Sequence, residues 1–256
     1  MGLRSAFIAR MLIALLTDIH GNREAFSACL AHARSLNVDR FVLLGDYVGY
    51  GADPAWVVDT VRTMVNEGAV ALLGNHDAAI DGSDEEMNSI AQEAIRWTRG
   101  QLGMEQRAFL ADLPLVHEEG SVLYAHANGF APRGWHYITD VMEASRHFGR
   151  VDAHITFCGH VHVPMLYHMS NTAKVGSFSP VSDNDIPLLS TRSWIAVIGA
   201  VGQPRDGVPA ANYAVFDTAR QSLRYFRVPY DNMTAARKVR EAGLPERLAQ
   251  RLEEGR

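Results

Sequence analysis

Short apolar runs alternate with helical patterns along the first half of the chain. Residues 12–16, 40–44 and 70–73 have the length and composition of buried strands. Between them, residues 24–35 and 54–66 carry the periodicity of helices, and the second of these begins at an Asp-Pro pair typical of a helix start. This alternation predicts parallel strands joined by crossover helices.

The second half of the chain has a different pattern, which looks more antiparallel. Residues 85–110 predict a helical region, in which Ile90, Ala94, Ile95 and Trp97 form one buried stripe. The remaining elements expected before the tail are strands at 122–125, 153–158, 194–198, 213–216 and 223–228 and a helix at 140–148.

The chain shows no internal repeat, low-complexity segment or linker, so we expect one domain over residues 1–256. Residues 1–10 are interpreted as an N-terminal extension or a mis-chosen start. Residues 231–256 form a helical tail, in which 234–256 predict two short amphipathic helices that cover an edge and keep a solvated outer face.

Composition narrows the functional class. A hydrophobic fraction of 47% is enough for a sizeable core, and a net charge of -5 argues against stable nucleic-acid binding. The two cysteines are too few for a disulfide framework, which favours a reducing cytoplasm. The apolar stretch at 7–16 is not interpreted as a secretory signal, and its residues 11–16 are interpreted as a buried strand. No run approaches the roughly 20 residues of a membrane-spanning helix.

Polar clusters follow directly after four of the predicted strands. They are Asp18-Ile19-His20, Gly45-Asp46, Gly74-Asn75-His76-Asp77 and Gly159-His160-Val161-His162. In open α/β sheets ligands collect beyond the carboxyl ends of the strands, so these clusters predict one shared site. Ligands separated by one residue project to the same side of an extended backbone, which suits chelation.

Carboxylate, imidazole and carboxamide groups without a thiolate suit divalent Mn, Fe, Zn, Co or Ni, and the residues do not choose among them. Two such ions would polarise a phosphoryl group and lower the pKa of a water between them. The clusters therefore favour phosphoester hydrolysis.

Together with His126, these motifs in this order resemble the calcineurin-like metallophosphoesterase family. The segment Val201-Gly202-Gln203-Pro204-Arg205-Asp206-Gly207 is similar to a bacterial and archaeal branch of it. The resemblance implies an α/β fold with two packed mixed β-sheets flanked by helices, a four-layer α/β/β/α sandwich. It also implies two divalent metal ions, one held by Asp18, His20 and His162, the other by Asn75, His126 and His160, with Asp46 bridging both.

The resemblance further implies that His76 lies outside the inner ligand shell. There it would stabilise the transition state or protonate the leaving oxygen, with a bridging hydroxide as nucleophile. Relatives among the protein phosphatases carry an aspartate three residues after the bridging one, which orients this histidine, whereas this chain has Gly49. Asp77 or Asp53 would then replace it, or His76 would act without a carboxylate partner.

Three further positions have both a functional and a structural interpretation. Arg205 is the best basic candidate for binding substrate phosphate, although it equally fits a surface arginine in a turn. His136 is a weaker candidate for substrate contact, and Tyr50 either shapes the pocket or belongs to the core.

The sequence thus predicts a cytoplasmic enzyme that hydrolyses phosphomonoesters or phosphodiesters of a small molecule or nucleotide, with Asn75 and Arg205 as substrate contacts. No membrane partner is expected, and the oligomeric state is not readable. The alternative is a metal-binding scaffold or regulatory module that has lost catalysis. A nuclease is disfavoured by the acidic net charge.

Overall fold

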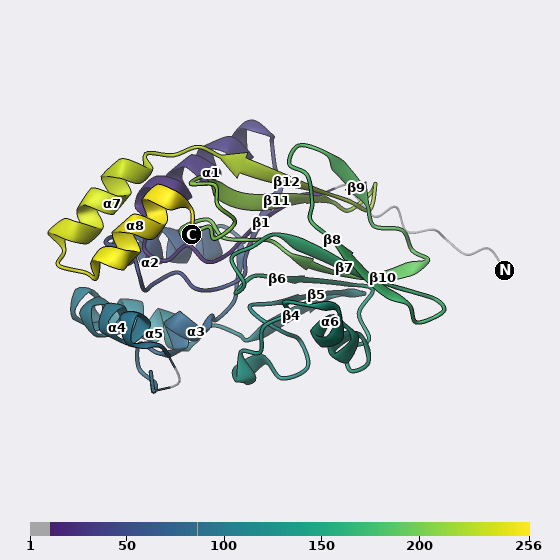
Figure 1. Ribbon diagram of the computed structural model, residues 1–256, viewed down its shortest axis with the longest axis horizontal. Coiled ribbons are helices and arrows are strands. Elements are labelled where there is room, and N and C mark those ends of the chain that lie inside the picture. Colours follow the sequence, from purple (N-terminus) through teal and green to yellow (C-terminus); the bar gives the residue numbers. More distant parts are fainter. Residues whose placement is uncertain (1–10, 86) are drawn as a thin grey trace.

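The structure is a computed structural model, which describes residues 11–85 and 87–256 (Figure 1). The strands of the first sheet are β1 (Leu12–Leu16), β2 (Arg40–Leu43), β3 (Val70–Ala71), β9 (Asp185–Pro187), β11 (Ala211–Asp217) and β12 (Ser222–Val228). Those of the second sheet are β4 (Val116–Glu119), β5 (Val122–Ala125), β6 (Ile155–Cys158), β7 (Met165–Ser170), β8 (Val175–Phe178) and β10 (Arg192–Val197).

Each sheet has six strands and a mixed topology. The strand order is β3-β2-β1-β11-β12-β9 in the first sheet and β4-β5-β6-β10-β7-β8 in the second. The pairs β1/β2, β2/β3, β5/β6 and β6/β10 are parallel, and the remaining pairs are antiparallel. The predicted change from parallel strands to a more antiparallel second half is therefore confirmed.

Within the described residues, eight helices and one 3-10 turn flank the sheets. They are α1 (Arg23–Ser35), α2 (Pro54–Asn66), α3 (Asn75–Ala78), α4 (Ser89–Gln101), α5 (Met104–Ala111), the 3-10 turn η1 (Pro132–Gly134), α6 (Val141–Phe148), α7 (Asn232–Glu241) and α8 (Glu246–Glu254). α1 and α2 pack on the first sheet and α6 on the second, while the two sheets pack on each other (Figure 1). The four-layer α/β/β/α sandwich expected from the resemblance is confirmed.

Strand β1 shows why its sequence is continuously apolar. Ile13 and Leu15 face the second sheet, whereas Ala14 and Leu16 face α1 and α2. A strand buried on both faces has no polar side, so the usual alternation disappears. Because β1 lies between β2 and β11, the interpretation of the apolar run as a strand is confirmed over 12–16.

The helical region predicted over 85–110 is confirmed, whereas four strands were missed. The helical region predicted over 85–110 is two helices, because the backbone is extended at Leu102 and Gly103 begins α5 by donating its N–H to Oε1 of Gln106 at 2.9 Å. Strands β4, β7, β8 and β9 were not predicted.

The tail forms the two predicted helices, α7 and α8, but they lie beside the strand ends and not over a sheet edge (Figure 1). Lys238 of α7 binds Glu24 at 2.6 Å and Asp53 at 2.8 Å, which ties the tail to the starts of α1 and α2. Asp53 precedes α2 as expected, but its side chain makes no capping hydrogen bond.

The extension predicted at residues 1–10 lies outside the described residues. Single-domain organisation stays a prediction. None of the helices formed by residues 11–85 and 87–256 combines the length and the apolar character that crossing a membrane requires.

Candidate metal centre

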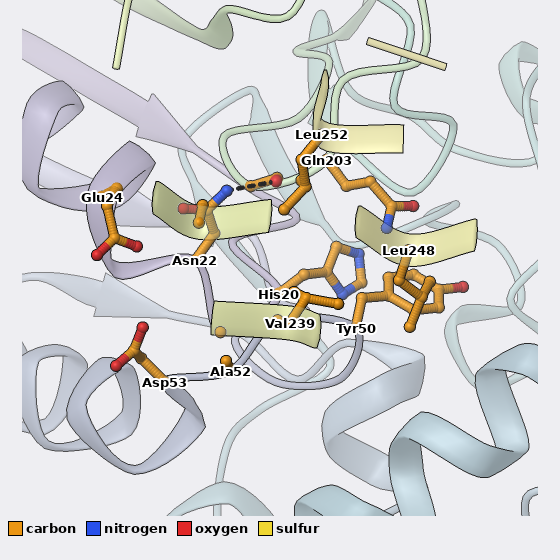
Figure 2. Close-up of a pocket in the computed structure, with 14 residues that line it drawn as sticks. His20, Asn22, Glu24, Tyr50, Ala52, Asp53, Gln203, Val239, Leu248 and Leu252 are labelled. Atoms are coloured by element: carbon orange, nitrogen blue, oxygen red, sulfur yellow. Dashed lines mark hydrogen bonds between the residues drawn. The ribbon is translucent and has the colours of Figure 1, made fainter. Parts of the chain in front are cut away.

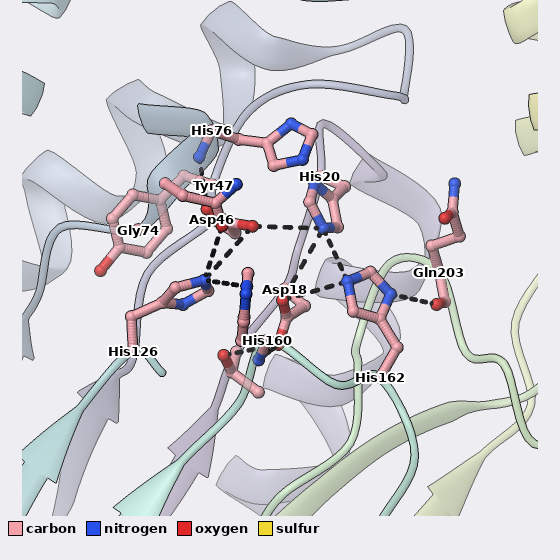
Figure 3. A network of polar contacts seen from close by, with 12 residues as sticks. Asp18, His20, Asp46, Tyr47, Gly74, His76, His126, His160, His162 and Gln203 are labelled. Atoms are coloured by element: carbon pink, nitrogen blue, oxygen red, sulfur yellow. Dashed lines mark hydrogen bonds and ion pairs between the residues drawn. The ribbon is translucent and has the colours of Figure 1, made fainter. Parts of the chain in front are cut away.

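The polar clusters that follow the strands come together in one buried site (Figure 3). Asp18 and His20 follow β1, Asp46 follows β2, and Asn75 begins α3 just after β3. From the second sheet, His126 follows β5, and His160 and His162 follow β6. The site therefore lies where strands of both sheets end.

One group of donor atoms lies around Nε2 of His20. This atom is 3.1 Å from Nε2 of His162, 3.8 Å from Oδ1 of Asp18 and 3.6 Å from Oδ2 of Asp46. Oδ1 of Asp18 is also 3.2 Å from Nε2 of His162. Ligands bound to one ion at about 2.0–2.2 Å lie roughly this far from one another. The group therefore has the spacing of a metal site.

A second group lies around Nε2 of His126. This atom is 3.1 Å from Oδ1 of Asn75, 3.2 Å from Nδ1 of His160 and 3.4 Å from Oδ2 of Asp46. The same oxygen of Asp46 thus lies beside both groups. Two sites that share one carboxylate can be built from these side chains.

The two carboxylates each use one oxygen for the protein and leave the other for the cluster. Oδ2 of Asp18 accepts hydrogen bonds from the hydroxyl of Thr17 at 2.8 Å and from the backbone N–H of His160 at 2.9 Å. Oδ1 of Asp46 accepts from the backbone N–H of His76 at 2.8 Å. Oδ1 of Asp18 is buried without a hydrogen-bond partner, which is unfavourable unless a cation binds it.

Three of the histidines are oriented through their other ring nitrogen. In each, Nδ1 donates to a backbone carbonyl: His20 to Val48 at 3.0 Å, His126 to Leu44 at 2.9 Å and His162 to Gln203 at 2.6 Å. A proton on Nδ1 leaves the lone pair of Nε2 directed at the cluster, as in metal-binding histidines.

The charges of the cluster suit ligation. Burial raises the pKa of Asp18 and Asp46, but the neighbouring histidines outweigh it and lower the pKa of both below the ordinary value. Burial lowers the pKa of His20 well below 6.5 and that of His160 to about 3. Burial opposes the proton of His126 too, yet Asp46 raises its pKa to about 9. Apart from His126, these groups hold the protonation states that metals bind.

The backbone is left-handed at most of the candidate ligands. Positive φ angles occur at Asp18 (53°), His20 (48°), Asp46 (58°), His160 (67°) and His162 (64°). This conformation costs about 1–2 kcal/mol for a residue with a β-carbon, and such strain gathers at functional sites.

Glycine makes the close approach of the loops possible. A β-carbon at Gly74 would overlap with the backbone nitrogen of Asp46, and one at Gly159 would overlap with Oγ1 of Thr17 and lie 2.5 Å from Oδ2 of Asp18. The lack of a β-carbon at these two positions therefore lets the loops approach the cluster.

Comparison with known proteins agrees with this geometry. The profile described as the calcineurin-like phosphoesterase superfamily domain matches residues 11–221. A metallophosphoesterase from Sphaerobacter thermophilus has 35% identity and a TM-score of 0.85, with 97% of this chain and 100% of that chain covered. An uncharacterised protein of Methanocaldococcus jannaschii is 32% identical over 97% of this chain and its own full length. The chain belongs to the calcineurin-like phosphoesterase superfamily.

A more distant structure shows the same fold. A hypothetical protein from Pyrococcus horikoshii has 18% identity and a TM-score of 0.77, with 96% of this chain and 98% of that chain covered. This likeness concerns the fold alone.

Gly49, the departure from the related protein phosphatases, has a steric reason in this calcineurin-like phosphoesterase. Its φ is +81°, and a β-carbon there would overlap with Nδ1 of His76 and lie 3.2 Å from Cγ of the same ring. The His76 ring also packs against Tyr50, with ring centroids 4.5 Å apart, and against His20 at 4.8 Å. Packing against Gly49, Tyr50 and His20 therefore orients the His76 ring, a role that an aspartate has in the related protein phosphatases.

Neither aspartate suggested as a replacement contacts the ring of His76. The carboxylate of Asp77 accepts four backbone N–H groups, from Asp46, Tyr47, Val48 and Gly74, at 2.8–3.2 Å. Burial and the Asp46 carboxylate raise the pKa of Asp77 to about 7, against the pull of these N–H groups. Asp53 is paired with Lys238. That part of the sequence interpretation was wrong: Asp77 joins the two ligand loops.

A cleft of about 430 Å³ opens beside the cluster. Asn75, His76 and His160 line it, together with the aromatic rings of Trp135 and Tyr137. Tyr137 stacks on His160, with ring centroids 4.0 Å apart. His136, the weaker sequence candidate, is not among the lining residues, whereas its two neighbours are.

A smaller pocket of about 70 Å³ lies directly over the cluster and contains both Arg205 and Arg251. Arg205 is therefore not simply a surface arginine in a turn. The backbone of its loop is joined to the ligand loop, since Val201 donates to Thr17 at 3.0 Å and Gly202 to Asp18 at 2.8 Å. Arg251 was not predicted, because its position in α8 looks like the solvated face of an amphipathic helix.

The tail helices form the wall behind His20 (Figure 2). Leu248 and Leu252 of α8 line a small cavity with His20, Tyr50 and Gln203. Its volume of about 10 Å³ leaves room for at most one water. The tail is thus part of the site's support and not the cover of a sheet edge.

Proposed function

We propose that the protein is a metal-dependent phosphoesterase that binds two divalent ions at this cluster. Asp18, His20 and His162 would hold one ion, and Asn75, His126 and His160 the other, with Asp46 shared. The observation that carries the proposal is the position of Oδ2 of Asp46, 3.6 Å from His20 and 3.4 Å from His126. The unpartnered Oδ1 of Asp18 supports it.

Two bound divalent ions would supply the polarisation of a phosphoryl group and an activated water. The residues of the chain supply orientation. Asp77 holds the Asp46 loop, and the backbone N–H of His76 fixes the other oxygen of Asp46. The side chain of Asn75 reaches the cleft as well as the cluster, so it would contact substrate as well as metal.

His76 would act on the phosphoryl group from outside the ligand set. Its Nδ1 is buried against Gly49, which leaves Nε2 as the nitrogen available to the pockets that the residue lines. Burial, opposed by Asp46, lowers the pKa of His76 to about 4, so the ring is neutral near pH 7. A neutral ring donates a hydrogen bond to developing negative charge, and we favour that role over protonation of the leaving oxygen.

The substrate would be a small phosphorylated molecule or nucleotide. The phosphate fits the small pocket with Arg205, and the organic group fits the larger cleft against Trp135 and Tyr137. Aromatic rings in the cleft suit a planar or apolar group. We infer a cytoplasmic location, which the two buried free cysteines support.

The first experiment combines metal content with turnover. Metal-stripped protein would be reconstituted with Mn or Ni and assayed on p-nitrophenyl phosphate and bis-p-nitrophenyl phosphate. We expect two ions per chain and metal-dependent turnover. Asp46→Asn should lose both, while Asp59→Asn, an exposed aspartate on α2, should behave as wild type. One tightly bound ion, or none, would contradict the two-ion proposal.

The alternative is a scaffold that binds metal without catalysis, and Gly49, which stands in place of an aspartate that would orient His76, is the observation that favours it. His76→Asn separates the two functions. A phosphoesterase should lose most of its turnover in this variant and keep its metal. If wild type binds two ions but hydrolyses neither ester, the scaffold becomes the better proposal.

A further inference from the structure

Two arginines from distant parts of the chain meet at one amide oxygen. Arg205 lies in the loop after β10, and Arg251 lies in α8 of the tail. Arg205 donates to Oε1 of Gln203 from Nη2 at 2.9 Å and from Nε at 3.3 Å, and Arg251 donates to the same oxygen from Nη1 at 3.5 Å. Gln203 is buried, whereas the two arginines are half-buried, so their guanidinium groups meet at the edge of the buried loop.

No carboxylate within residues 11–85 and 87–256 forms an ion pair with either of these guanidinium groups. Asp206, next to Arg205 in sequence, binds Arg227 at 2.6 Å instead. Burial lowers the pKa of Arg251, and the charge of Arg205 lowers it further. Two like charges held together around a neutral amide favour the binding of an anion between or beside them.

The arginine pair is tied to the candidate metal ligands. The backbone carbonyl of Gln203 accepts from Nδ1 of His162 at 2.6 Å, and the backbone N–H of Arg205 donates to the carbonyl of His162 at 3.2 Å. Arg205 also lies over the ring of Tyr50, 5.9 Å from its centroid. Figure 2 shows Gln203 between α8 and the loop that carries His20.

Both arginines line the small pocket over the cluster, together with Asp46, His76 and His162. Neither lines the larger cleft with the aromatic rings. Their guanidinium groups are therefore placed for the phosphate and not for the organic part of a substrate.

We propose that Arg251 is a substrate-binding residue, which forms with Arg205 a clamp for a phosphate group with two negative charges, so that the site prefers phosphomonoesters to phosphodiesters. A monoester near pH 7 carries close to two charges on three terminal oxygens. A diester carries one charge, and its second ester group takes the place of one of those acceptors. The proposal rests on the proposed phosphoesterase function for the position of the substrate.

The test has one arm without catalysis. Binding of inorganic phosphate would be measured by calorimetry for the metal-free and the metal-loaded full chain. The variants are Arg251→Gln and, as matched control, Arg247→Gln, which removes the same charge from an exposed position one turn earlier in α8. Loss of a charge-assisted contact should weaken phosphate binding roughly 10- to 100-fold in Arg251→Gln and hardly at all in Arg247→Gln.

The second arm measures kcat/KM for p-nitrophenyl phosphate and for bis-p-nitrophenyl phosphate. The ratio of monoester to diester should fall roughly tenfold or more in Arg251→Gln and stay constant in Arg247→Gln. A purely structural role of Arg251 would lower both rates together and leave the ratio unchanged. If the glutamine variant unfolds, Arg251→Lys replaces it in the test, because lysine keeps the positive charge but cannot donate two parallel hydrogen bonds. Its ratio of monoester to diester kcat/KM should lie between those of wild type and Arg251→Gln.

Unchanged phosphate affinity in Arg251→Gln, or an unchanged ratio in a folded variant, would overturn the clamp. Failure of the proposed function looks different. In that case wild type would hydrolyse neither ester, while the loss of phosphate binding in Arg251→Gln would still support the clamp.

Discussion

Replacing Gly49 with alanine tests whether steric contact holds His76. The glycine sits at a φ of +81°, and an added β-carbon would overlap with Nδ1 of the His76 ring. Tyr50 packs on the ring with centroids 4.5 Å apart and His20 lies 4.8 Å away, so a shift of the ring disturbs both contacts. We therefore expect the substitution to strain the backbone and to displace the ring.

The two effects can be estimated separately. A left-handed backbone costs about 1–2 kcal/mol for a residue with a β-carbon, and forcing an extra carbon into a packed region costs about 1–3 kcal/mol. Gly49→Ala should thus lose about 2–5 kcal/mol in the free energy of unfolding. In a domain of this size each kcal/mol lowers Tm by about 2–4 °C.

Gly68→Ala is the matched control, because Gly68 has a φ of +101° and its added β-carbon meets no atom within 4 Å. It should lose about 1–2 kcal/mol from the backbone alone. Thermal unfolding of both variants, metal content and turnover on p-nitrophenyl phosphate form the assay. Gly49→Ala should keep its metal but lose at least about tenfold in turnover, because the displaced His76 ring would no longer donate its hydrogen bond in the transition state. Equal destabilisation of the two variants, with turnover intact in Gly49→Ala, would refute the reasoning.

Three further changes probe the support of the site and the rest of the fold. Asp77→Asn leaves a single acceptor oxygen for four backbone N–H groups, so its free energy of unfolding in urea should fall by about 3 kcal/mol. An unchanged unfolding midpoint would show that Asp77 does not stabilise the two loops. Burial lowers the pKa of His147 from 6.5 to about 4, so the unfolded chain binds its proton first and stability falls as pH falls through this window. Between pH 7 and 4.5, His147→Leu should therefore lose about 2–3 kcal/mol less of its free energy of unfolding than wild type. Urea unfolding of both proteins at the two pH values would measure this. If the two proteins differ in stability by the same amount at both pH values, the prediction is wrong. Lys238→Met leaves Glu24 and Asp53 without their cation and should lower Tm at low salt more than at high salt, whereas equal shifts would mean that the ion pairs contribute little.

The position of the site could be predicted from the sequence because it depends on strand ends. Apolar runs such as 12–16 are buried on both faces, so they are visible without any alternation, and the polar residues after them mark where the chain leaves the sheet. Three of the missed strands, β4, β8 and β9, lack this signal. β4 has no fully buried residue, and β8 and β9 are edge strands whose residues are half-buried or exposed. An edge strand buries little, so its sequence is close to that of a loop.

Contacts between distant segments could not be predicted in the same way. Arg251 occupies a position that a helical pattern assigns to solvent, and only the packing of α8 against the Gln203 loop brings it to the pocket. Asp77 was one of the three alternatives that the sequence left open for the orientation of the His76 side chain. In the fold its carboxylate faces the backbone of the neighbouring ligand loop instead.

The left-handed backbone of the cluster could not be predicted from the sequence either. Aspartate and histidine adopt positive φ more often than most residues, but only a small fraction of them do so. The surrounding hydrogen bonds impose it: Asp18 donates to Gly45 at 3.0 Å and His20 donates to Asp46 at 2.9 Å, so each ligand loop shapes the next. At about 1–2 kcal/mol per residue, the positive φ angles of these five residues would cost about 5–10 kcal/mol in total, which is comparable with the 5–15 kcal/mol by which whole domains are stable. The five residues are Asp18, His20, Asp46, His160 and His162. The glycine contacts and the tail helices behind His20 are therefore as necessary to the cluster as the candidate ligands themselves. They hold the strained residues in the one arrangement in which the donor atoms of their side chains lie close together.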